Sequence, residues 1–112
     1  MKKYKINVPD ALLESMTSLA EIIHPEQPEI AIVILGENME EKHLKPHAFH
    51  IIHVYFFLRV DDEYHFVKEL ESFSFEDFRT AQALLLSLPS MSAFDLMIYQ
   101  NGIGLSSSNL LQ

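Results

Sequence analysis

The 112-residue sequence contains no cysteine, no tryptophan and only three glycines. Without cysteine there can be no disulfide, no thiolate metal ligand and no cysteine nucleophile. Gly102 and Gly104 lack the third glycine of a dinucleotide fingerprint, and no phosphate-binding loop sequence is present. Unbroken apolar runs are short, as in "IAIVIL" at 30–35, so no segment is expected to span a bilayer.

Basic residues are missing from a long N-terminal stretch. The formal net charge is −8, and the chain from Ile6 to Glu41 carries eight acidic residues without one Lys or Arg. Nucleic-acid affinity comes largely from Lys and Arg that neutralise phosphates, so we expect no RNA or DNA binding. The start "MKKYKINVPD" lacks the apolar segment of a signal peptide, which predicts a cytoplasmic protein without membrane association.

The composition, with 48% hydrophobic and 21% charged residues, is typical of a globular protein. We expect one domain over residues 1–112, with about 101–112 as a loosely packed tail. "KYKINV" at 3–8 alternates between polar and apolar residues, which predicts a strand with one buried face. The segment 29–36 is apolar on both faces and predicts a central strand. Between them, 10–23 is expected to form a helix, because apolar residues recur there at helical spacing: Leu12, Met16, Leu19, Ala20 and Ile23.

A long hairpin is expected after a polar loop at 37–48. The segments 50–60 and 64–73 are rich in β-branched and aromatic residues, and an acidic three-residue turn separates them. Hydrophobic matching sets the register, in which the opposed apolar pairs are Val60–Tyr64, Leu58–Phe66 and Val54–Leu70. This register places His53 opposite Glu71.

The C-terminal part predicts a helix at 74–89, capped by Ser74, and a last strand at 92–102. The order β-α-β-β-β-α-β then indicates an α+β protein with a mixed, mostly antiparallel sheet. We expect a two-layer sandwich with two helices on one face, a variant of the ferredoxin-like arrangement.

Four of the six histidines fall in "HLKPHAFHIIH" at 43–53. His43 and His47 have helical spacing, but Pro46 disfavours a helix through them. His50 and His53 are three apart in a predicted strand, which sends them to opposite faces. We therefore expect no metal site and no cofactor here.

Two helices on one face of the sheet leave the other face open unless the tail or the 37–48 loop covers it. An aromatic centre with a charged rim is typical of a protein interface. We predict a non-catalytic interaction or self-associating module that forms a homodimer or binds another protein. The expected interface residues are Ile51, His53, Tyr55, Phe57, Val67, Met97 and Tyr99.

An alternative is a small-ligand or catalytic site on the same face. Its lining would be His53, Tyr55, Glu71 and Tyr99, with the carboxylate orienting the imidazole as a general base. The sequence offers no nucleophile beside them, so no residue is assigned a catalytic role.

Overall fold

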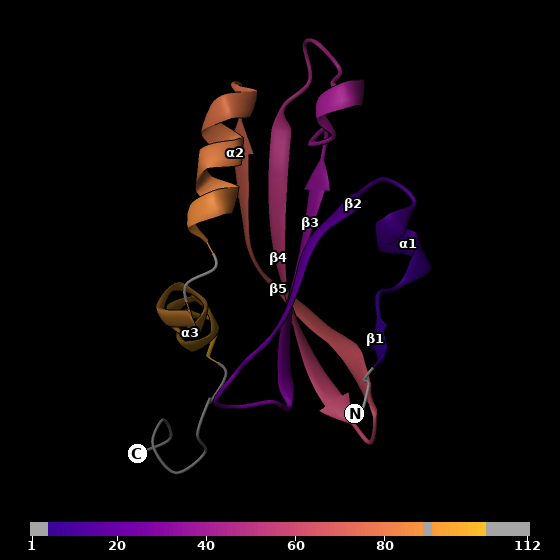
Figure 1. Cartoon of the computed structure of the whole chain (residues 1–112), viewed down its shortest axis with the longest axis vertical. Coiled ribbons are helices and arrows are strands. Elements are labelled where there is room, and N and C mark those ends of the chain that lie inside the picture. Colours follow the sequence, from indigo (N-terminus) through magenta and orange to yellow (C-terminus); the bar gives the residue numbers. More distant parts are fainter. Residues whose placement is uncertain (1–4, 89–90, 103–112) are drawn as a thin grey trace.

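The computed structural model describes residues 5–88 and 91–102 (Figure 1). The elements are β1 (Lys5–Asn7), α1 (Asp10–Leu13), β2 (Thr17–Ile23), β3 (Ile30–Glu37), the 3-10 turn η1 (Glu41–His43), β4 (His50–Val60), β5 (Glu63–Phe75), α2 (Phe78–Ser87) and α3 (Met91–Gln100). The strands form one curled sheet in the order β1-β5-β4-β3-β2, with β1 parallel to β5 and every other pair antiparallel. The predicted α+β class and the mixed, mostly antiparallel sheet are confirmed.

Both faces of the sheet are buried at its centre, because β3 carries no polar side chain before Glu37, its last residue. On one face, the even-numbered side chains of β3 and β4, such as Ile32 and Phe56, pack with α2 and α3. On the other face, the odd-numbered side chains, such as Val33 and Phe57, pack with residues of the N-terminal segment. Figure 1 shows this division, with α2 and α3 to the left of the central strands and α1 and the edge strand β1 to the right.

The predicted helix at 10–23 is wrong beyond its first turn. The helix α1 ends at Leu13, and 17–23 form β2, which pairs antiparallel with β3. The β-branched residues Thr17, Ile22 and Ile23 favour a strand. Pairing with β3 satisfies the backbone groups of this segment that point toward β3, and this tertiary contact outweighs the helical spacing.

The predicted strand at 92–102 is also wrong, because Met91–Gln100 form α3. Phe94 and Ile98 are fully buried one helical turn apart, and Met97 packs beside them. In the described chain two helices therefore follow four consecutive strands, so the expected β-α-β-β-β-α-β order does not occur.

The hairpin exists, but its register differs from the prediction. Asp61 and Asp62 alone make the turn, and Val60 pairs with Glu63. Asp61 has a φ of 60°, a left-handed conformation that aspartate tolerates. Two further shifts, between Val54 and Tyr55 and between Phe56 and Phe57, break the regular pairing. His53 consequently lies opposite Ser72 instead of Glu71.

The predicted helix after the hairpin is confirmed as α2, although its cap is Asp77 and not Ser74, which remains in β5. The Asp77 carboxylate accepts hydrogen bonds from the Thr80 hydroxyl and the Thr80 backbone N–H, at 2.8 and 2.9 Å. These two bonds lower the pKa of Asp77, because they stabilise its charged form.

Candidate functional site

The centre of the predicted interface is buried within the chain. Tyr55 and Phe57 are 4% and 0% exposed. The cover comes from the N-terminal segment and not from the 37–48 loop. The tail, which is the other cover that the sequence suggested, lies outside the described residues from 103 on. The cover consists of the partly buried residues Ile6, Val8, Leu12 and Met16. The sheet face that we expected to be open is therefore closed over its aromatic centre.

The remaining predicted residues do not form one surface with these two. Ile51 is partly buried, and Val67 is 43% exposed beside one of the register shifts of β5. Met97 and Tyr99 belong to α3, which packs on the opposite face of the sheet. Glu71 lies opposite Val54, so the four residues of the alternative ligand site are not brought together.

His53 and Tyr55 are the pair from both predicted sets that the structure places together, with ring centroids 6.0 Å apart. His53 Nε2 lies 2.7 Å from Glu37 Oε2, and its Nδ1 lies 3.6 Å from Glu69 Oε2. The second distance is too long for a hydrogen bond, and Nδ1 is buried without a partner in the described chain. The two carboxylates come from β3 and β5, so His53 lies between acidic side chains of both strands that pair with β4.

The same environment perturbs Tyr55. Burial, together with the negative charges of Glu69 and Glu37, raises the pKa of its hydroxyl to about 12. The hydroxyl contacts Met16 Sδ at 3.8 Å. Tyr55 therefore stays neutral at physiological pH, and a phenolate role in catalysis has no support in this geometry.

The histidine-rich segment forms a loop whose backbone is hydrogen-bonded to the side chain of Asn38. The Asn38 side chain donates to the carbonyl oxygens of Lys45 and Ala48, at 3.0 and 3.1 Å, and accepts from the Lys45 N–H at 2.6 Å. Asn38 itself has a φ of 57°, and His47 has a φ of 74°. One amide side chain thus replaces the backbone pairing that this irregular loop lacks.

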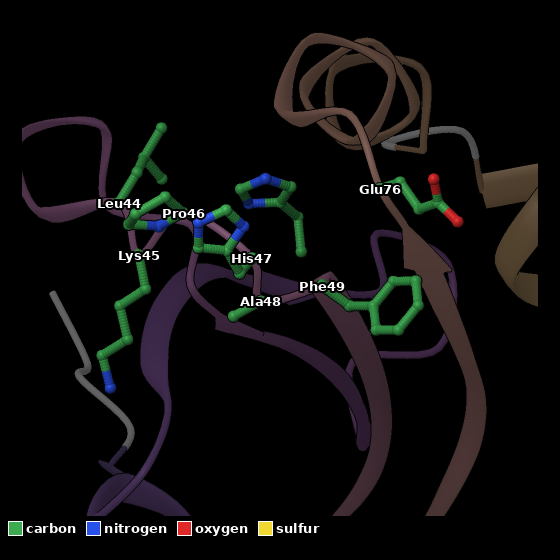
Figure 2. A pocket seen from close by; sticks show the side chains of 8 residues that line it. Leu44, Lys45, Pro46, His47, Ala48, Phe49 and Glu76 are labelled. Carbon is green, nitrogen blue, oxygen red and sulfur yellow. The ribbon is translucent and has the colours of Figure 1, made fainter.

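A hollow of about 500 Å³ lies beside this loop (Figure 2). Figure 2 shows Phe49 and Glu76 on one side of it and Lys45 on the other. His50 also lines the hollow, and its Nδ1 lies 2.7 Å from the Asn38 carbonyl oxygen. A carbonyl oxygen only accepts, so Nδ1 carries a proton, and Nε2 of the neutral ring is an acceptor.

The outer edge of β2 is a further surface, one that the sequence did not reveal. In the described chain β2 is the last strand of the sheet on its side. The His24 N–H donates to the Ile30 carbonyl oxygen at 2.9 Å, and Ile22 pairs with Ile32 in the same register. Hydrogen-bonded and non-bonded pairs alternate in antiparallel sheets. The backbone groups of Glu21 and Ile23 therefore point away from β3, toward the open edge.

The side chains of β2 are mostly apolar, with Glu21 as its single charged residue. Leu19, Ala20 and Ile22 are only partly buried, and Ile23 is 40% exposed. The helices pack on the inner strands, α2 on β4 and β5 and α3 on β5, so β2 lies at the margin of the helical layer. The sequence signal for this strand was its pair of adjacent isoleucines, which the helical spacing of other residues obscured.

Residues 5–88 and 91–102 contain no group of three His, Asp or Glu side chains arranged to hold a metal ion. Within the same ranges no helix has the length and apolar character needed to cross a membrane. Asn101 donates to the Leu70 carbonyl oxygen at 3.0 Å, and the rest of the predicted tail, 103–112, lies outside the described residues.

Fold and surface together define an α+β protein with a curled five-stranded sheet and an apolar strand at one edge. No protein-family model, curated protein or solved structure matches the chain.

Proposed function

We propose that the chain is a non-catalytic protein-interaction module that binds through the outer edge of β2, where it accepts an extended strand. The observation that carries this proposal is the outward direction of the Glu21 and Ile23 backbone groups on an edge strand that is mostly apolar. A strand with unpaired donors and acceptors is a template for strand addition. This surface replaces the sheet face that the sequence suggested, because Tyr55 and Phe57 of that face are buried.

The usual protection of sheet edges is weak on β2. Natural edges are blunted by short strands, Lys, Pro or bulges. The edge strand β2 has seven residues and contains neither Lys nor Pro. One register shift between Ser18 and Ala20 leaves a regular segment from Ala20 to Ile23.

The test uses a synthetic peptide of residues 18–24 with two lysines added at each end, and Glu21→Pro as the disrupting variant. Proline removes the outward N–H of Glu21 and leaves the pairing of Ala20 and Ile22 with β3 intact, as edge strands allow. Glu21→Ala is the matched control, since it removes the same charge and keeps the N–H. We expect Glu21→Pro to weaken peptide binding at least about tenfold relative to Glu21→Ala, which is the effect of about 1.4 kcal/mol.

A scrambled peptide of the same composition controls for attraction between its lysines and the acidic chain. Equal binding of both peptides, or equal binding by the two variants, would show that the edge of β2 is not the binding surface. Circular dichroism on each variant checks that the fold is retained.

A further inference from the structure

The direction of the backbone groups and the position of Glu21 also restrict which strand fits this edge. We infer that the partner is β2 of a second copy of this chain, paired antiparallel about a two-fold axis at Ile22. This inference rests on the proposed function of the β2 edge and adds the identity and register of the partner strand. A two-fold axis makes the interface self-complementary, which is the commonest arrangement of homodimers.

Hydrogen bonding limits the choice to three registers. In the regular segment, the backbone N–H and C=O groups that point away from β3 belong to Glu21 and Ile23. A second β2 strand can form hydrogen bonds with them only if its own Glu21 or Ile23, or another residue with outward-pointing groups, lies directly opposite. A strand that pairs with itself meets this condition when the two-fold axis passes through Ala20, Glu21 or Ile22. An axis at Ile23 would oppose Glu21 to Pro25, which has no N–H to donate.

The register shift between Ser18 and Ala20 and the charge of Glu21 exclude two of these three registers. An axis at Ala20 pairs Glu21 with Leu19, and Leu19 lies within the register shift of β2. An axis at Glu21 opposes two carboxylates directly, which is destabilising. An axis at Ile22 pairs each Glu21 with Ile23 of the partner subunit and uses only the regular segment.

The side chains on this axis suit a self-association contact. Ile22 is partly buried on the helical face of the sheet and extends the apolar core to its edge. At the axis the two Ile22 side chains would meet across a non-hydrogen-bonded pair, where Cα atoms approach to about 4.5 Å. Exposed apolar surface of Ile22 and Ile23 is then removed from water in both copies.

The absence of cysteine makes the register directly measurable. A Cα separation of about 4.5 Å lies within the range that a disulfide spans. We expect Ile22→Cys to form a disulfide-linked dimer under mild oxidation, while Ala20→Cys and Glu21→Cys remain largely unlinked. Each variant reports one register, so the three serve as matched controls for each other. Light scattering on the wild-type chain at micromolar concentration should give the mass of a dimer, and Glu21→Pro should give that of a monomer.

The outcomes separate this inference from the proposed function. A dimer that is cross-linked through Ala20→Cys or Glu21→Cys but not through Ile22→Cys overturns the register and leaves the edge as the binding surface. A wild-type monomer that binds the peptide of residues 18–24 overturns the homodimer alone. A monomer that does not bind the peptide overturns both proposals.

A second measurement covers the case in which a cysteine variant fails to fold. Amide hydrogen exchange on the wild-type chain should show Glu21 and Ile23 protected in the dimer and exposed on dilution. A dimer in which these two amides exchange freely would place the contact elsewhere and overturn the inference.

Discussion

His24 Nε2 lies 2.9 Å from Asp95 Oδ1, so the residue that follows β2 is joined to the middle of α3. His24 is 1% exposed, and its Nδ1 accepts from the backbone N–H groups of Glu26 and Gln27. A nitrogen that accepts two hydrogen bonds carries no proton, so Nε2 holds the ring proton and donates it to Asp95. The sheet edge and the helical layer are thus connected by one oriented histidine.

This assignment predicts different effects for two substitutions of Asp95. Asp95→Ala leaves a buried N–H without an acceptor and should lower the free energy of unfolding by about 1–3 kcal/mol. Asp95→Asn keeps an acceptor oxygen at the same position and should cost clearly less. Urea denaturation measures both values, with Leu96→Ala, an exposed neighbour, as the control. Equal losses for the two Asp95 variants would contradict the assigned proton.

The loop at 38–49 should depend on the side chain of Asn38. Asn38→Ala removes three side-chain hydrogen bonds to Lys45 and Ala48 and should cost roughly 1–3 kcal/mol. Limited proteolysis with trypsin, which can cleave after Lys42 but not at the Lys45–Pro46 bond, should be faster in this variant.

The variant Asn38→Gly distinguishes the contribution of the Asn38 side chain to stability from that of its left-handed backbone conformation. Glycine adopts the φ of 57° without strain, so this variant should lose the loop contacts but be more stable than Asn38→Ala by about 1 kcal/mol. If trypsin cut all three proteins at the same rate, the bracing role of Asn38 would be wrong.

The raised pKa of Tyr55 predicts that the folded chain loses stability in alkaline solution. The pKa of Tyr55 rises from an ordinary value of 10.0 to about 12 in the folded chain. Above pH 10 the unfolded chain loses this proton while the folded chain keeps it, so stability falls with rising pH until about pH 12. Tyr55→Phe has no such proton and should show a shallower decline over this range. Denaturation at several pH values, with ultraviolet absorbance to follow phenolate formation, makes the comparison.

Continuous apolar patterns allowed the centre of the sheet to be predicted. The segment "IAIVIL" has no helical periodicity, and its β-branched residues are typical of a buried strand, as β3 is. The hairpin of β4 and β5 was recognisable because two long β-rich segments flank an acidic turn. In both cases local pattern and tertiary environment favour the same structure.

The edges were not predictable in the same way, because their residues fit two periodicities. Residues four apart, such as Phe94 and Ile98, lie on the same face in a strand and in a helix. The burial of Met97 beside them favours the helix. In the segment 17–23, antiparallel pairing with β3 favours a strand. Short apolar segments of this kind are resolved by contacts with distant residues.

The surroundings of His53 depended on features without a sequence signal. A shift of pairing by one or two residues changes every cross-strand neighbour. The two register shifts of the hairpin therefore replaced the expected Glu71 with Ser72 as the residue opposite His53. Glu37, the actual hydrogen-bond partner, comes from β3, and no local sequence pattern indicates that it lies beside His53.

The parallel pairing of β1 with β5 has a consequence for the order of folding. Asn7 and Glu63, whose side chains are bonded at 3.0 Å, are 56 positions apart in the chain. Loop closure over such a separation is slow compared with the formation of a local hairpin. We therefore expect the N-terminal segment to dock after β3, β4 and β5 have assembled, so that Tyr55, Phe57 and Tyr64 face water until then. On the ribosome, residues 5–16 emerge before β5 but have no site to occupy until β5 has been synthesised, which leaves this aromatic surface uncovered in the nascent chain.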